Sequence, residues 1–243
     1  MSMVIDKLRQ YGLLKFIYFS LHEMQLFFIH RLLLGSYSQL QEDLVLDRLT
    51  GHKKQGFYVD VGAYDPYRFS NTMRFYLRGW RGINIEPNTE HWKRFKKYRP
   101  GDTNLNIGIG EKRGALTFYS INPPTLSTFS QKQAFEYQKE GFQTTSAKKI
   151  SIYDLASVLR KYAKRKRIDF LSIDVEGYEM SVLKSNNWER FRPRYLCIET
   201  ASESGDGART KKIQKAVGVY LRAHGYNYVL SNSLNSFYKD SYE

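Results

Sequence analysis

The stretch DFLSIDVEGYE, Asp169 to Glu179, starts as an apolar strand and ends with acids on either side of a glycine. Asp174 follows the apolar run directly, and Glu176 and Glu179 come within the next five residues. In an open parallel sheet, ligands bind beyond the carboxyl ends of the strands. The stretch therefore predicts a buried strand of such a sheet that carries functional acids at its end.

Outward from this stretch, short apolar runs alternate with segments of helical period from residue 56 onward. This alternation is typical of an α/β domain with a mostly parallel sheet and helices on both faces. We expect strands at 57–61, 82–85, 103–107, 116–119, 168–173 and 194–198. We expect helices at 71–77, 90–97, 152–162, 180–184 and 210–224, and a terminal hairpin within 226–240.

Two stretches interrupt this rhythm. Residues 122–146 are polar and aromatic, and an insertion of this length in a compact domain is usually a lid or a binding loop. Residues 202–208 are rich in Gly and Ser, which indicates a mobile loop. The length of 243 residues fits one domain with an appendage, which we place at 1–50 as an N-terminal helical extension before a domain of 51–243.

The amphipathic segment Leu13 to Leu34 belongs to that extension. Charged residues and histidines interrupt it, so neither a transmembrane helix nor a signal peptide is expected. Two interpretations stay open: the helix packs against the domain or a second subunit of a homodimer, or it lies on a membrane surface. We favour packing.

Composition limits the partners and the compartment. Thirty-eight Lys and Arg against 24 Asp and Glu give a net charge of +14, which favours anionic partners such as nucleic acid, charged glycans or lipid head groups. Basic runs at 93–99, 160–167 and 209–215 are expected to be solvated helix faces, and 160–167 stands out as an anion-binding patch. The single cysteine, Cys197, excludes an internal disulfide and indicates a cytoplasmic location, with membrane association if the N-terminal helix lies on a membrane.

Acids end four of the expected strands: Asp60, Glu86, Asp174 and Glu199. If these strands are parallel, the four side chains converge on one edge of the sheet. Glu86 follows the turn at Gly62 by about 20–25 residues, where an acid can accept hydrogen bonds from the ribose of an adenosine cofactor. Capping or an exposed strand end would explain Asp60 or Glu86 taken singly. Together the acids predict an adenosine site.

The acids after the expected strand at 168–173 suggest chemistry. Asp174 and Glu176 point the same way if the segment is extended, so they could share a divalent cation or supply a general base. Glu199 could complete the set, whereas Glu179 better suits a helix cap. The histidines form no pair at metal-ligand spacing, so a zinc site is not expected.

At these residues the chain resembles the FkbM family of S-adenosylmethionine-dependent O-methyltransferases. The resemblance covers roughly residues 36–200, and it rests on five motifs in the family's order: SYSQLQEDLVL (36–46), GFYVDVGAYDPYRFSNT (56–72), GINIEPN (82–88), NLNIGIGEKRG (104–114) and DFLSIDVEGYEMSVLKS (169–185). It implies a class I methyltransferase fold, Rossmann-like, with a seven-stranded sheet and one antiparallel strand. Residues 51–243 would be the methyltransferase domain.

The resemblance also implies roles for particular residues. The cofactor S-adenosylmethionine would contact Gln39, Asp60, Gly62, Ala63, Asn71, Thr72 and Glu86. Asp174 and Glu176 would be catalytic, and Asp174 and Glu199 would bind a divalent cation, Mg or Mn. Glu42 and Asp43 match the segment before the first strand, where a helix could close over the cofactor; for Asp43, capping or solvent exposure remains equally open.

From these implications we expect methyl transfer to a hydroxyl of an anionic sugar, glycan or glycan precursor. Aromatic residues of the insertion could stack on sugar rings or pack the insertion down: Phe129, Phe135, Tyr137 and Phe142. One alternative is RNA methylation, which we do not favour because the sequence shows no aromatic ladder or RNA-binding module. The other is a non-catalytic binding protein that keeps the fold.

Overall fold

The structure is a computed structural model that describes residues 35–201 and 207–243. The expected amphipathic helix at 13–34 lies outside the described residues, as does most of the Gly- and Ser-rich loop. Among the helices in the described ranges, none combines the length and the apolar character needed to cross a membrane.

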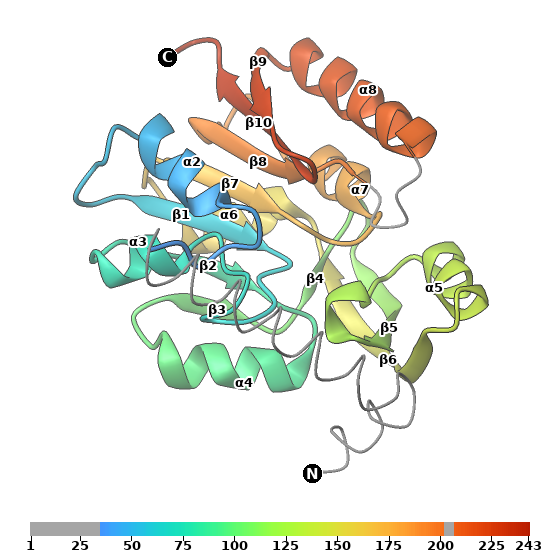
Figure 1. Ribbon diagram of the computed structural model, residues 1–243. Helices are drawn as coiled ribbons and strands as arrows, with labels where there is room; N and C mark the ends of the chain where they lie inside the picture. The colour runs from blue at the N-terminus through green and yellow to red at the C-terminus, as the bar shows by residue number, and fades with distance from the viewer. Residues whose placement is uncertain (1–34, 202–206) are drawn as a thin grey trace.

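A seven-stranded sheet forms the centre of the molecule, in the order β3-β2-β1-β7-β8-β10-β9 (Figure 1). Its strands are β1 (Phe57–Val61), β2 (Arg81–Ile85), β3 (Thr103–Leu105), β7 (Phe170–Ile173), β8 (Tyr195–Glu199), β9 (Tyr226–Ser231) and β10 (Asn235–Asp240). Strands β3, β2, β1, β7 and β8 pair in parallel, whereas β10 is antiparallel to both of its neighbours. This order is that of the class I methyltransferase fold, and it confirms the expected fold class and the terminal hairpin.

The strand order reverses between β1 and β7, because the chain builds outward to β2 and β3 on one side and to β8 on the other. A reversal of this kind leaves a crevice at the carboxyl ends of the two central strands. The fold therefore places any ligand site beyond Val61 and Ile173.

Helices cover both faces of the sheet (Figure 1). They are α2 (Glu42–Leu49), α3 (Met73–Leu77), α4 (Thr89–Tyr98), α6 (Leu155–Tyr162), α7 (Glu179–Lys184) and α8 (Gly207–Ala223). On one face, Leu46 of α2 and Phe75 of α3 pack with Tyr58 and Phe170 of the sheet. On the other face, α6, α7 and α8 pack on the opposite side chains of the same strands. Helix α2, which falls within residues 1–50, thus shares a core with the sheet.

Helix α6 begins three residues later than the helix predicted at 152–162. Ile152 and Tyr153 belong to a strand instead, where they pair with residues 108–109. Asp154 then caps the helix, because its carboxylate accepts a hydrogen bond from the Ser157 N–H at 2.8 Å. The sequence of residues 152–153 is compatible with a helix or a strand, and the pairing with β4 decides for the strand.

The insertion is an ordered unit, which corrects the prediction of a loop at 122–146. A second sheet, in the order β4-β6-β5, contains β4 (Gly108–Ile109), β5 (Gly114–Asn122) and β6 (Gln143–Tyr153). Between β5 and β6 lie a 3-10 turn, η2 (Pro124–Leu126), and helix α5 (Gln131–Lys139). Ile121, Leu126, Ala134 and Tyr137 form a small core of their own. We refer to residues 108–153 as the inserted unit.

Candidate active site

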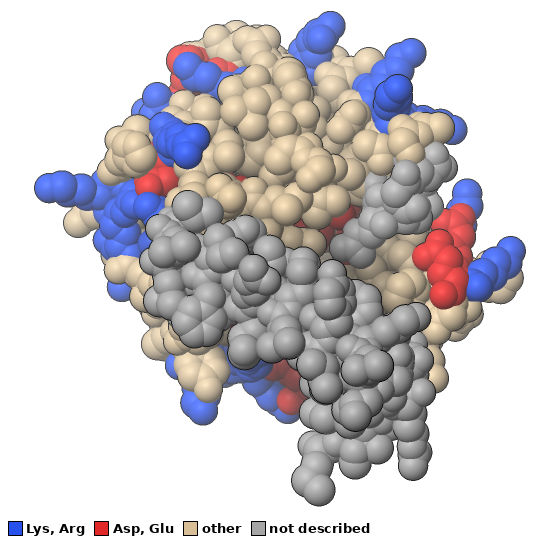
Figure 2. Space-filling model, in the orientation of Figure 1, with Lys and Arg blue, Asp and Glu red and all other residues tan. Residues whose placement is uncertain are grey.

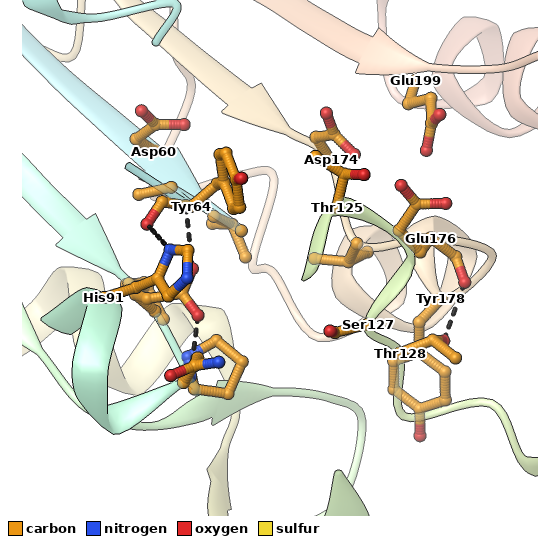
Figure 3. Close-up of a pocket in the computed structure, with 18 of the residues that line it drawn as sticks. Asp60, Tyr64, His91, Thr125, Ser127, Thr128, Asp174, Glu176, Tyr178 and Glu199 are labelled. Carbon is orange, nitrogen blue, oxygen red and sulfur yellow. Dashed lines mark hydrogen bonds between the residues drawn. The ribbon is translucent and has the colours of Figure 1, made fainter. Parts of the chain in front are cut away.

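The four strand-end acids line one cavity at the carboxyl edge of the sheet. Asp60 lies near the end of β1 and Glu199 is the last residue of β8, whereas Glu86 follows β2 and Asp174 follows β7. These four strands are parallel neighbours. Figure 3 shows Asp60 on one side of the cavity and Asp174 and Glu199 on the other. The predicted convergence of these side chains on one edge is confirmed.

The turn after β1 brings two chain segments into close contact. Gly62 has φ +84°, and a Cβ atom on it would lie 1.6 Å from the carbonyl oxygen of Asp174. The N–H groups of Gly62 and Ala63 donate to the Ile85 carbonyl at 3.0 and 3.1 Å. Both residues line the cavity, as predicted. The glycine is required here by the β7 backbone, whereas the sequence had suggested close approach to a ligand.

Asp60 lies at the floor of the cavity with a fixed orientation. The Thr72 hydroxyl donates to its carboxylate at 2.8 Å, and Thr72 itself is fully buried behind Asp60 and does not line the cavity. Asn71 does line it and donates to the Ser172 hydroxyl at 3.0 Å. Burial raises the pKa of Asp60 to about 6, against the lowering effect of the Thr72 hydrogen bond.

Glu86 is held by backbone groups on both oxygens. Its carboxylate accepts from the Tyr64 N–H at 2.8 Å and from the Asn88 N–H at 2.7 Å. Burial nevertheless raises the pKa of Glu86 to about 8. A carboxylate has about four lone-pair positions, so these two bonds leave room for hydroxyl donors. The geometry fits an acid that receives the two hydroxyls of a ribose.

The raised pKa of Glu86 gives a pH prediction. Between its ordinary pKa of 4.5 and about 8, the folded cofactor-free protein keeps a proton that the unfolded chain releases, so this group's contribution to stability declines as pH rises through that range. Ribose hydroxyls favour the ionised carboxylate. We therefore expect the affinity for S-adenosylhomocysteine, measured by calorimetry from pH 6 to 8.5, to rise by up to about tenfold per unit and level off above about 8. Glu86→Gln should flatten that slope, and a flat profile in the wild-type protein would contradict the assignment.

Three carboxylates gather on the other side of the cavity (Figure 3). One oxygen from each of Asp174, Glu176 and Glu199 lies within 4.8 Å of the other two. The segment is not extended as predicted, since Glu176 has φ +52° and Gly177 has φ +88°. A tight left-handed turn therefore brings Asp174 and Glu176 together, where the sequence had suggested strand alternation.

Glu179 supports this turn from beneath. Its carboxylate accepts from the Gly177 N–H at 2.9 Å, and the side chain is buried. Burial raises the pKa of Glu179. Tyr178 is the N-cap residue of α7 and Glu179 is the first residue of the helix, so Glu179 holds the preceding turn and is not the N-cap residue that the sequence suggested.

Helix α2 and the loop before it form part of the cavity wall. Gln39 and Glu42 line the cavity, and Glu42 accepts from the side-chain amides of Asn232 and Asn235 at 2.8 and 3.0 Å. Asp43 is buried away from it and accepts from the hydroxyls of the two serines before α2, Ser36 and Ser38. Asp43 therefore fixes the loop that carries Gln39 and takes no direct part in the cavity.

Several lining residues had no signal in the sequence. His91 projects from the first turn of α4, with Nδ1 at 2.7 Å from the Tyr64 carbonyl oxygen and its ring 4.7 Å from the Tyr64 ring. Because a carbonyl only accepts, Nδ1 carries the proton in this contact, and burial lowers the pKa of His91. The inserted unit adds a wall of hydroxyl and aromatic side chains: Phe118, Thr125, Ser127, Thr128 and Phe129.

The four aromatic residues predicted to stack on sugars separate in the structure. Phe129 lines the cavity. Tyr137 and Phe142 pack edge to face within the inserted unit, with ring centroids 5.9 Å apart, and Phe135 is exposed. Only Phe129, among these four, is placed to meet a ligand in the cavity.

Charge is divided between two edges of the molecule. The ionisable side chains along the described cavity wall are His91, Tyr64, Tyr178 and six acids, Glu42, Asp60, Glu86, Asp174, Glu176 and Glu199, with no Lys or Arg among the described lining residues. On the face that Figure 2 shows, Lys and Arg side chains lie mainly around the periphery. The six Lys and Arg side chains of the run 160–167 are exposed, as predicted, although α6 ends at Tyr162 and the rest of the run is not helical. The run precedes β7, so it lies at the edge opposite the cavity. In the run 93–99, Arg99 is fully buried, which corrects the expectation of a solvated face.

The strand order, the glycine turn and the acid-lined cavity define a class I methyltransferase that uses S-adenosylmethionine. The acids suit this cofactor chemically, because Asp60 can face its cationic methionine part and Glu86 its ribose. Residues 60–228 match the model of the methyltransferase FkbM domain, and the chain belongs to this family.

Solved structures with similar folds include three methyltransferases. The C-terminal domain of precorrin-6Y C5,15-methyltransferase from Rhodobacter capsulatus is 10% identical, with coverage of 81% of this chain and 85% of that chain and a TM-score of 0.40. The O-methyltransferase from Bacillus cereus in complex with SAH is 13% identical, with coverage of 82% of this chain and 78% of that chain and a TM-score of 0.41. The METTL16 MTase domain is 12% identical, with coverage of 88% of this chain and 77% of that chain and a TM-score of 0.43. No curated protein matches the chain by sequence.

Proposed function

We propose that the protein transfers the methyl group of S-adenosylmethionine to a hydroxyl of a sugar, glycan or glycan precursor. The observation that carries this proposal is the cluster of Asp174, Glu176 and Glu199 beside the glycine turn of the cofactor site. An aliphatic hydroxyl keeps its proton at neutral pH, so its methylation needs a base or a Lewis acid. A carboxylate beside the methyl donor can itself act as the base, and a group of carboxylates can bind a cation that acts as the Lewis acid.

The carboxylates have distinct roles in this proposal. Asp174, whose backbone carbonyl packs against Gly62 of the glycine turn, accepts the hydroxyl proton, and Glu176 orients the acceptor. Asp174 and Glu199 are the residues that would hold a divalent cation, since carboxylate oxygens suit Mg or Mn. When bound, such a cation supplies Lewis acidity to the acceptor oxygen.

Chelation tests the metal part of the proposal. We expect treatment with EDTA to reduce methyl transfer and added Mg²⁺ or Mn²⁺ to restore it. The same ions should raise the melting temperature, because they bind the folded state alone and relieve repulsion among three close carboxylates. Glu199→Gln should lose most of this thermal shift, whereas Glu90→Gln, at an exposed position outside the cavity, should keep it. Full activity after thorough chelation would show that no cation is needed, and the proposal would then keep only the carboxylate base.

The cavity wall supports a polyhydroxylated acceptor. Thr125 and Ser127 line the cavity with hydroxyl side chains, and Phe129 lines it with an aromatic ring, a group that can stack on a sugar. The net charge of +14 still favours an anionic acceptor, but the described cavity wall contains six acids and neither Lys nor Arg. The hydroxylated end of the acceptor therefore enters the cavity, and an anionic group stays outside it.

A methyl-transfer screen tests the function. Radiolabelled S-adenosylmethionine is incubated with sugar nucleotides, glycans and RNA, with and without chelator, and the labelled position is located by mass spectrometry. Label on a sugar hydroxyl supports the proposal. Label on RNA, together with salt-dependent RNA binding, would identify RNA as the methyl acceptor in place of a sugar. Failure to bind S-adenosylmethionine in calorimetry would favour a non-catalytic role.

A further inference from the structure

A fully buried arginine lies behind the cofactor side of the cavity. Arg99 follows the last turn of α4, and its guanidinium pairs with the equally buried Asp102 at 3.1 Å. The guanidinium also lies over three rings, those of Tyr58, Tyr76 and Phe95, at 5.0–5.5 Å from their centroids. These contacts fix the charge in one orientation.

One hydrogen bond of this arginine connects it, through Thr72, to Asp60 in the cavity wall. Its Nη2 donates to the Thr72 hydroxyl oxygen at 3.0 Å, and that hydroxyl lies 2.8 Å from the Asp60 carboxylate. An arginine side chain can only donate, so it uses a lone pair of the Thr72 oxygen and leaves the single hydroxyl proton for Asp60. The direction of the Thr72 hydrogen bond is thus set by the buried cation.

We propose that Arg99 and Thr72 form a positioning relay that orients the Asp60 carboxylate toward the cationic methionine part of S-adenosylmethionine. Asp60 is the member of this chain of contacts that lines the cavity; Thr72 and Arg99 are buried behind it. The Arg99 cation lowers the pKa of Asp60 and the paired Asp102 carboxylate raises it, so the relay acts on Asp60 through the Thr72 hydrogen bond. The relay concerns the cofactor, so it stands whatever the acceptor is.

Thr72 is the better position for a test than Arg99. Removal of Arg99 would leave Asp102 buried without its cation, and such a change can unfold a protein. Thr72→Val keeps the volume and removes the hydroxyl, whereas Thr72→Ser keeps the hydroxyl. Tyr58→Phe is the matched control, because the Tyr58 hydroxyl accepts from the same Arg99 Nη2 at 2.7 Å but makes no hydrogen bond to Asp60.

Calorimetry with S-adenosylhomocysteine and thermal unfolding of the full chain are the two measurements. We expect Thr72→Val to weaken binding by about tenfold, Thr72→Ser to stay within about twofold, and Tyr58→Phe to lower the melting temperature with unchanged affinity. In turnover assays, Thr72→Val should raise the KM for S-adenosylmethionine and leave kcat at saturating cofactor unchanged. Added to Asp60→Asn, it should cause no further loss, because both changes act on one contact.

Three outcomes would overturn the relay: wild-type affinity in Thr72→Val, equal losses in the valine and serine variants, or a loss in Tyr58→Phe as large as that in Thr72→Val.

Discussion

Asp174→Asn should reduce the rate of methyl transfer by about 10²–10⁴-fold and leave the fold intact. Asparagine keeps the size of the side chain but loses the negative charge and the basic oxygen. The backbone of residue 174 is unchanged, so its N–H still donates to the Val61 carbonyl at 3.0 Å and its carbonyl still packs against Gly62. The measurement is a single-turnover rate with radiolabelled S-adenosylmethionine and the acceptor found in the screen.

The control for this variant is Glu189→Gln, the same acid-to-amide change at an exposed position outside the cavity, which should keep full activity. Thermal unfolding and S-adenosylhomocysteine affinity show whether Asp174→Asn remains folded and able to bind. Undiminished transfer in that variant removes Asp174 from the chemistry. Lost transfer together with a lower melting temperature would assign the residue a structural role.

Gly62→Ala should have the largest effect on stability among single changes at the cavity. The new Cβ would lie 1.6 Å from the Asp174 carbonyl oxygen, so the turn after β1 and the end of β7 must move apart. The left-handed backbone and the overlap together should cost about 2–5 kcal/mol in the free energy of unfolding. Cofactor binding should be lost as well, because the displaced segments are the two sides of the cavity. Urea unfolding and calorimetry measure the two effects.

Gly51→Ala separates the two causes. Gly51 also has a positive φ, +66°, but nothing lies within 4 Å of a Cβ placed there. We expect this variant to lose only about 1–2 kcal/mol, from backbone strain, and to keep its cofactor affinity. Equal losses in the two variants would show that the contact between Gly62 and Asp174 has no special importance.

The parallel sheet was predictable because its strands are short apolar runs with clear ends. The strand predicted at 57–61 matches β1 residue for residue. The inserted sheet was harder to predict from the sequence. Its strand β6 pairs with β5, is mostly exposed, and has the sequence QTTSAKKISIY, which shows little apolar alternation. Its stability depends on contacts between residues far apart in the chain, which local patterns do not report.

The acids of the site were predictable for the same reason as the strands. Parallel neighbours bring their carboxyl ends to one edge, so Asp60, Glu86, Asp174 and Glu199 had to lie near one another. The arrangement behind them was not predictable, because Asp60, Thr72 and Arg99 come from three separate parts of the chain. Side-chain hydrogen bonds alone connect Arg99 to Thr72 and Thr72 to Asp60. A basic run in the sequence gave no sign that one of its arginines is buried.

The separation of charge along β7 has a physical consequence. Six exposed cations at 160–167 precede this strand, while Asp174 and Glu176 follow it, so the two ends of β7 carry opposite charge and the acids lie at the mouth of the cavity. The field at this acidic mouth favours cations over anions, which agrees with an acceptor whose anionic group stays outside the cavity. The same field would attract a sulfonium compound from solution to the cavity where it reacts.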